Sequence, residues 1–222
     1  MKYNWYKLET PWSLLASDSL LTIAKIALTD TGKYVAIIDH RGCLDTTTEF
    51  PLNVWAKPLA KIGYDPNYSP CLRGNKFMFT NQSSVANSTI FSRSWKAVSP
   101  VKTAVTTSFS QVFSSAGNQT VQLIVVSAEG CLDTETVVVK VKGHPVSQFA
   151  FAKAAQCDKN NRFDVVNSSV NPASSGGGSL WYIYDWKDGV SGADVAAASH
   201  NFSLSGKYNV QLIVKNAVGC SD

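Results

Sequence analysis

The sequence predicts an all-β protein built from tandem β-sandwich modules. Charged residues make up only 16% of the 222 residues and aromatic residues 11%, and Ser, Thr, Val and Ala are abundant. That composition is typical of short strands joined by polar turns, and not of helical bundles or disordered tails. A segment from the middle of the chain also recurs at its C-terminal end, which indicates repeated modules.

The recurring segment reads TVQLIVVSAEGCLD in the middle of the chain and NVQLIVKNAVGCSD at the end, at a constant offset of 89 residues. The aligned segments share ten identities, among them the run Val121–Val125 against Val210–Val214. Apolar and polar residues alternate in this run, which is the pattern of a strand with one face toward a core. The Gly-Cys pair also lies at the same distance from Gly117 as from Gly206. We therefore predict the same strand in two modules.

The repeat extends upstream and divides the chain. Cys71 precedes NKFMFTNQSS and Cys157 precedes NRFDVVNSSV, each a predicted strand that ends in an Asn/Ser turn. A third GCLD at Gly42–Asp45 marks an earlier module. The predicted domains are a partial module at 1–58 without its early strands, a module at 59–144, and a module at 145–222 without its last strand. The linkers AKPLAK and GHPVS are short and contain proline, which favours an extended array.

The first module carries a further signal. NWYK is a predicted strand with Trp5 as a core aromatic residue, and SLLTIAKIALTDTGKYVAIID supplies two more strands around the turn at Asp30–Gly32. The spacing from Asp30 to Tyr34 resembles the tyrosine corner of immunoglobulin-like sandwiches, in which the Tyr hydroxyl bonds to the backbone. Ala36 stands where antibody-type domains carry cysteine.

The five cysteines fall into early and late positions of the modules. Equivalent positions in the two repeats predict the disulfides Cys71–Cys131 and Cys157–Cys220, which close loops of about 60 residues and stabilise each module by roughly 4 kcal/mol. Four cysteines allow three connectivities, and free buried cysteines are the alternative. A zinc site is disfavoured because no CxxC or adjacent histidine supports one.

Cys43 is a late cysteine without an early partner in the chain. We expect its mate upstream of residue 1, so that Cys43 is left unpaired by truncation. The chain is then a fragment of a longer array, truncated at both ends, and Met1 is an expression start. The disulfides predict an extracytoplasmic location.

The third module resembles the PKD (polycystic kidney disease) domain, an immunoglobulin-like β-sandwich. That family shows W-D-F-G-D-G and then H-x-Y/F…G-x-Y-x-V-x-L-x-V. This chain has YDWKDG at Tyr184–Gly189 and SHNFSLSGKYNVQLIV at Ser199–Val214. The departures are Tyr184, Trp186 and Lys187, in place of Trp, Phe and Gly. The second module is similar at AGNQTVQLIVVSAEGC but keeps only Trp95 from the turn, and the resemblance covers roughly 60–222.

The resemblance implies PKD-type sandwiches in tandem. The style of repeat is similar to gliding-motility adhesins of Bacteroidota and to other type IX secretion system cargo. It implies a secreted protein at the cell surface, attached to the outer membrane through its parent, with neighbouring modules of the same chain as partners.

Two side-chain groups are candidate binding sites. Trp181, Trp186 and Tyr182 lie in LWYIYDW, where aromatic rings either stack on a glycan or pack in the core. Asp185, Asp188 and Asp194 offer oxygen ligands for Ca²⁺, with turn hydrogen bonds as the alternative.

Other chemistry is not indicated by the sequence. His40, His144 and His200 stand in no metal-ligand spacing and beside no nucleophile motif, and no phosphate-binding loop occurs, so we predict no catalytic residue and no cofactor. The net charge of +4 is spread without a basic cluster, which argues against nucleic acid. No apolar run of about 18 residues exists for direct membrane insertion.

The predicted function is a non-enzymatic extracellular β-sandwich segment of a large cell-surface adhesin, acting as spacer or stalk and adhesion module. The alternative is a carbohydrate-binding accessory module of a secreted polysaccharide-degrading enzyme, with surface polysaccharide as the partner. The alternative requires Trp181 or Trp186 to be exposed, whereas a spacer buries them.

Overall fold

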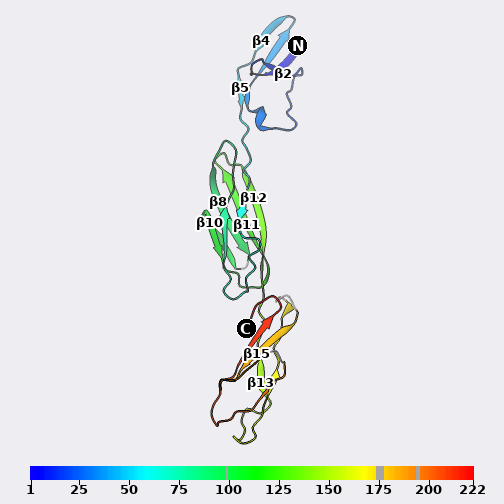
Figure 1. Cartoon of the computed structure of the whole chain (residues 1–222). Coiled ribbons are helices and arrows are strands. Elements are labelled where there is room, and N and C mark those ends of the chain that lie inside the picture. Colours follow the sequence, from blue (N-terminus) through cyan, green and yellow to red (C-terminus); the bar gives the residue numbers. More distant parts are fainter. Residues whose placement is uncertain (99, 174–177, 194–195) are drawn as a thin grey trace. The chain divides into compact units, whose positions relative to one another are not determined.

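The computed structural model describes residues 1–98, 100–173, 178–193 and 196–222, and Figure 1 colours the strands along the chain. Within these ranges no α-helix occurs, a 3-10 turn lies at Leu28–Asp30, and the strands form small antiparallel sheets. The all-β class with immunoglobulin-like β-sandwiches is confirmed. The chain divides into two compact units, residues 1–59 with 84–92 and 125–133, and residues 60–83 with 93–124 and 134–222.

The first sheet has the order β2-β1-β3-β4, and β5 pairs with the start of β3. Its strands are β1 (Lys2–Lys7), β2 (Ser13–Ala16), β3 (Gly32–His40), β4 (Cys43–Thr46) and β5 (Phe50–Leu52). The strand predicted before the Asp30–Gly32 turn does not form. A strand needs a free edge to pair with, and β1 lies along one edge of β3 while β4 and β5 share the other.

The predicted tyrosine corner is confirmed. The Tyr34 hydroxyl donates a hydrogen bond to the Asp30 carbonyl oxygen at 2.5 Å, and burial, together with the Asp30 charge, raises the pKa of Tyr34. Two more hydrogen bonds of this kind join residues with the same spacing of four. The Tyr208 hydroxyl donates to the carbonyl oxygen of Leu204 at 2.9 Å, and the Gln119 amide donates to that of Ser115 at 2.9 Å. In the second predicted module, Gln119 therefore makes the hydrogen bond that tyrosine makes in the other two.

Residues 60–141 form two sheets with a core between them. One sheet holds β6 (Ile62–Gly63), β7 (Phe77–Asn81) and β10 (Ser108–Gln111), and the other β8 (Ile90–Val98), β9 (Val101–Ala104), β11 (Gly117–Ser127) and β12 (Leu132–Val141). Trp95 is fully buried, lies parallel to the Phe109 ring at 5.7 Å and donates to the Thr106 carbonyl at 2.8 Å. The ring of Phe79 packs against Trp95 from the facing sheet.

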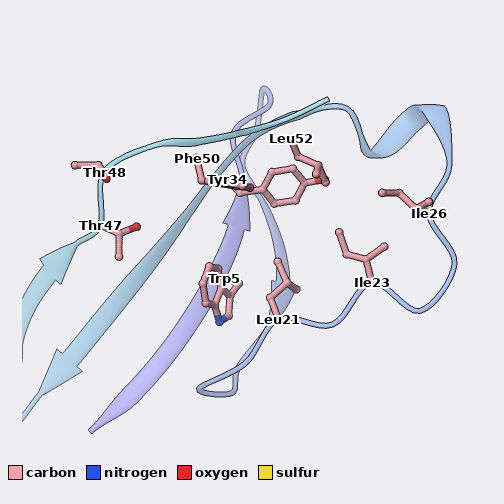
Figure 2. A pocket seen from close by; sticks show the side chains of 9 residues that line it. All are labelled: Trp5, Leu21, Ile23, Ile26, Tyr34, Thr47, Thr48, Phe50 and Leu52. Atoms are coloured by element: carbon pink, nitrogen blue, oxygen red, sulfur yellow. The ribbon is translucent and has the colours of Figure 1, made fainter. Parts of the chain in front are cut away.

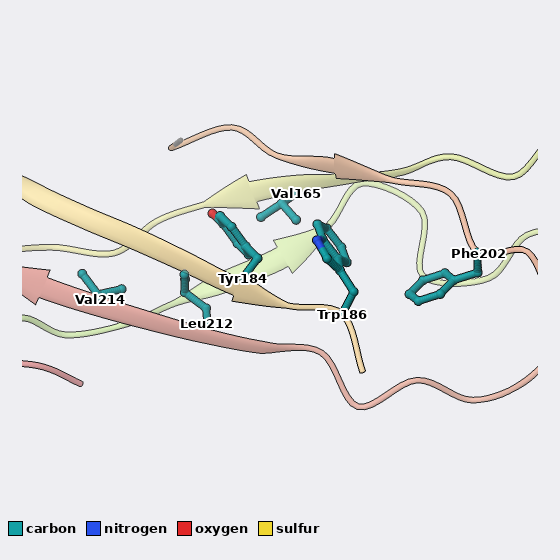
Figure 3. Packing of buried hydrophobic residues seen from close by; sticks show 6 residues of the cluster. All are labelled: Val165, Tyr184, Trp186, Phe202, Leu212 and Val214. Atoms are coloured by element: carbon teal, nitrogen blue, oxygen red, sulfur yellow. The ribbon is translucent and has the colours of Figure 1, made fainter. Parts of the chain in front are cut away.

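Residues 149–216 repeat this plan. One sheet holds β13 (Phe149–Phe151), β14 (Phe163–Asn167) and β17 (Ser199–His200), and the other β15 (Leu180–Asp185), β16 (Ser191–Ala193) and β18 (Gln211–Asn216). Figure 3 shows their side chains meeting between the strands. The buried cluster consists of Val165, Tyr184, Trp186, Phe202, Leu212 and Val214. Tyr184 occupies the position of Trp95, as the offset of 89 predicts.

Each sheet takes its strands from one predicted module, whereas the two compact units cut across the second module. The boundaries 1–58, 59–144 and 145–222 therefore stay a prediction.

Candidate functional site

The structure contains a disulfide bond between Cys71 and Cys220, 149 residues apart, with a Cα–Cα distance of 5.7 Å. The predicted pairing is therefore wrong. Cys131 and Cys157, the partners predicted for Cys71 and Cys220, are free, and Cys43 is also free. The bond links the early cysteine of the second predicted module to the late cysteine of the third.

The length of one strand explains this pairing. Cys131 directly precedes β12, whereas Cys71 bridges Lys142, directly after the end of that strand. A ten-residue strand separates its ends by roughly 33 Å, and a disulfide requires Cα atoms within about 7 Å. The early and late cysteines of one module thus lie at opposite ends of the module, out of reach of each other.

Asp222 adds polar contacts around the disulfide. Its carboxylate accepts hydrogen bonds from the backbone N–H and the hydroxyl of Ser147 at 2.9 and 2.8 Å, and it pairs with Arg73 at 3.0 Å. These hydrogen bonds from Ser147, and then the Arg73 charge, lower the pKa of Asp222. The carboxylate therefore connects the GHPVS linker to the segment beside Cys71.

His144 lies at the same place. The Arg73 backbone N–H donates to its Nε2 at 2.6 Å, so this nitrogen is an acceptor and Nδ1 carries the proton. Nδ1 lies 3.2 Å from the Ser221 carbonyl oxygen. The buried Asn216 side chain donates to the Gly143 carbonyl oxygen at 3.0 Å. We call the disulfide with these side chains the joint.

A tight turn presents Cys220 to the joint. The Asn216 N–H donates to the Cys220 carbonyl at 2.9 Å, and the Cys220 N–H donates to the Asn216 side chain at 2.9 Å. Gly219 adopts a φ of 87° in this turn, a conformation that favours glycine. The Gly-Cys pair that repeats in the sequence therefore marks this turn. The roles of Arg73, His144 and Asp222 were not predicted from the sequence.

The aromatic candidates divide between surface and core. Trp186 is 3% exposed, stacks against the His200 ring at 4.6 Å and belongs to the buried cluster, so it cannot contact a glycan in the folded protein. Tyr182 is half-buried against the same cluster. Trp181 is 42% exposed and lies on β15 opposite Lys215 of β18. Of the three, Trp181 therefore offers an open ring.

The acidic candidates make turn hydrogen bonds. Asp185 accepts from the Lys187 backbone N–H at 3.0 Å, and Asp188 from that of Val190 at 3.1 Å. Hydrogen bonds from Lys187 lower the pKa of Asp185, and the contact with His200 at 2.6 Å lowers that of Asp188. Asp194 lies outside the described residues. Elsewhere in the described ranges no three His, Cys, Asp or Glu side chains gather in a metal-binding group.

The first compact unit has an open apolar pocket with a volume of about 570 Å³, which the sequence did not predict. Figure 2 shows Trp5 of β1 and Tyr34 of β3 on one side and the loop residues Leu21, Ile23 and Ile26 on the other. The loop that failed to form a strand thus supplies one wall. Its wall residues are almost all apolar, so this surface offers no charged group for catalysis or metal binding.

No helix among the described residues is both long and apolar enough to cross a membrane.

The sequence matches no protein-family model and no curated protein. Similar solved structures include the PKD1 domain of Vibrio anguillarum Epp, with 20% identity and a TM-score of 0.34, covering 40% of this chain and 96% of that domain. The PKD1 domain of the Vibrio cholerae metalloprotease PrtV has 25% identity and a TM-score of 0.33, covering 38% and 96%. Three N-terminal domains of the bacteriophage RB49 outer capsid protein Hoc have 14% identity and a TM-score of 0.42, covering 96% and 80%.

Proposed function

We propose that this chain is a non-enzymatic spacer segment of an extracellular cell-surface adhesin, in which disulfide-linked sandwiches resist extension. The observation that supports this most is the Cys71–Cys220 bond. Disulfides persist in oxidising extracellular compartments and are rare in the cytosol. This bond supplies no reactive group for catalysis, but it fixes the junction between the two predicted modules that it joins.

The bond also changes how tension passes through the chain. Force applied at the two termini is transmitted from Cys71 to Cys220 through the disulfide, so the chain between these two cysteines carries no tension. The third sandwich and most of the second lie inside this loop. The Asp222 and His144 contacts sit beside the bond and hold the same two segments together. A spacer that must keep its length under load gains from such an arrangement.

Single-molecule stretching of the chain between its termini tests the proposal. The oxidised chain is expected to release about 50 nm less contour length than the reduced chain, because 149 residues at roughly 3.4 Å each stay inside the closed loop. The Cys71→Ser variant is the control, and under oxidising conditions it should extend like the reduced protein. Equal lengths before and after reduction would contradict the proposal.

Carbohydrate binding is a second candidate, supported by the exposed ring of Trp181. Aromatic rings on a sheet surface can stack on sugars, as in an accessory module of a polysaccharide-degrading enzyme. A polysaccharide screen with Trp181→Ala tests it, with Val166→Ala, an exposed apolar residue on the other sheet, as the matched control. Saturable binding lost only in Trp181→Ala would support this candidate, and absence of binding would leave the spacer.

A further inference from the structure

The segment that carries the early cysteine, which we call the early half-site, occurs twice in the chain. Beside Cys71, the Asn75 side-chain amide donates to the carbonyls of Leu72 and Phe113 at 2.6 and 2.9 Å. The Phe113 N–H donates back to the Asn75 oxygen at 2.8 Å. Asn75 is buried, so this clamp fixes the segment that carries Cys71 against the sandwich.

The same clamp lies beside Cys157. The buried Asn161 side chain donates to the carbonyls of Asp158 and Phe202 at 2.8 Å each, and the Phe202 N–H donates back at 2.8 Å. The offset from Asn75 to Asn161 equals the offset from Cys71 to Cys157. Asn161 therefore fixes the segment beside Cys157 as Asn75 fixes the segment beside Cys71, but the Cys157 thiol is free and exposed.

The Gly-Cys turn that carries the late cysteine, which we call the late half-site, also occurs twice. In the turn that ends at Cys131, the Ser127 N–H donates to the Cys131 carbonyl at 2.8 Å and the Gly130 N–H to the Ser127 carbonyl at 3.1 Å. Gly130 has a φ of 84°, close to its counterpart before Cys220. Besides the hairpin at Cys43, the described residues thus contain two early and two late half-sites. The Cys71–Cys220 disulfide joins an early half-site to the late half-site of the next predicted module.

We infer that Cys157 is a second disulfide site, whose partner is the late cysteine of another β-sandwich module with the same Gly-Cys turn. Cys131 is by the same rule the late half for an early cysteine of a preceding module. Successive bonds of this kind would form overlapping loops, so that each module is tied to both neighbours. The inference does not rest on the proposed surface role, because it follows from the equivalence of the half-sites.

The chemistry requires an oxidant. Two thiols lose two protons and two electrons to form the S–S bond, and a disulfide such as oxidised glutathione takes them up to become two thiols. Exposure of Cys157 makes its thiol accessible to both the oxidant and a partner.

An extended chain tests the inference. A second copy of residues 134–222 is added directly after Asp222, which keeps the repeat in register because Asp222 is the counterpart of Asp133. After oxidation with a glutathione buffer, free thiols are alkylated and disulfide-linked peptides are mapped by mass spectrometry. We expect a bond from Cys157 to the added Cys220, beside the original Cys71–Cys220 bond. In the extended chain with Cys157→Ser, the added Cys220 should become alkylated.

A second extension guards against failure of the added copy to fold. Residues 46–133 are added after Asp222 instead, since Asp45 is the counterpart of Asp133 in the first GCLD. The added Cys131 is then the late cysteine expected to bond to Cys157. Alkylation of Cys157 in both extended chains, with Cys71–Cys220 intact, would overturn the inference. So would a bond from Cys157 to the late cysteine of its own module.

Discussion

Replacing Cys71 by serine is expected to lower the free energy of unfolding of the second compact unit by about 5 kcal/mol. The bond closes a loop of 149 residues. In the chain-entropy model, closing a loop of this length lowers the entropy of the unfolded chain, so loss of the bond lowers the free energy of unfolding by roughly 5 kcal/mol. Chemical denaturation followed by tryptophan fluorescence measures the change. Reduction of the unchanged protein should give the same shift.

Cys157→Ser is the matched control, because Cys157 is the counterpart of Cys71 in the next repeat and is free. We expect this exposed substitution to change stability by less than about 0.5 kcal/mol. If Cys157→Ser destabilised the protein as much as Cys71→Ser, the bonds would lie within the modules and the joint would be contradicted.

Replacing Trp186 by alanine is expected to cost about 3–5 kcal/mol, because a large buried ring is lost and a cavity remains. Trp186 stacks on Tyr184 at 5.8 Å and on His200 at 4.6 Å, and its ring edge meets Phe202. Loss of the ring therefore affects both sheets of the third sandwich. Near-ultraviolet circular dichroism and the denaturation midpoint report the effect.

Trp181→Ala tests the exposed face of β15, the strand that ends directly before Trp186. Trp181 lies on β15, and its ring is open to solvent, so truncation should cost less than about 1 kcal/mol. Similar losses in Trp181→Ala and Trp186→Ala would contradict the assignment of Trp186 to the core.

Local patterns in the sequence predicted the local structure well. The alternation in Val121–Val125 and Val210–Val214 places these residues in strands or directly before one, and the Asn/Ser turns after β7 and β14 form through the side chains of Asn81 and Asn167. The Asp30 to Tyr34 spacing likewise predicted the corner, because its hydrogen bond joins residues close in sequence. Such features depend on neighbouring residues only.

The errors concern partners that are distant in the chain. A repeat shows that Cys71 and Cys157 are equivalent, but it cannot show whether a bond stays in one module or passes to the next. That choice depends on the length of β12, which keeps Cys131 away from Cys71. The strand predicted before Asp30 failed for a related reason, since β1, β4 and β5 occupy both edges of β3, the strand that follows the turn. The Gln119 corner was not predicted, because the tyrosine-corner pattern requires a tyrosine where this module has glutamine.

Disulfide mapping of the unreduced chain tests the joint most directly. Free thiols are alkylated first, and the protein is then digested with trypsin at mildly acidic pH to prevent exchange. The structure predicts peptide 62–73, with Cys71, linked to peptide 216–222, with Cys220, while peptides 103–140 and 154–159 carry alkylated cysteines. Peptide 62–73 linked to 103–140, together with 154–159 linked to 216–222, would contradict the joint and place both bonds within single modules.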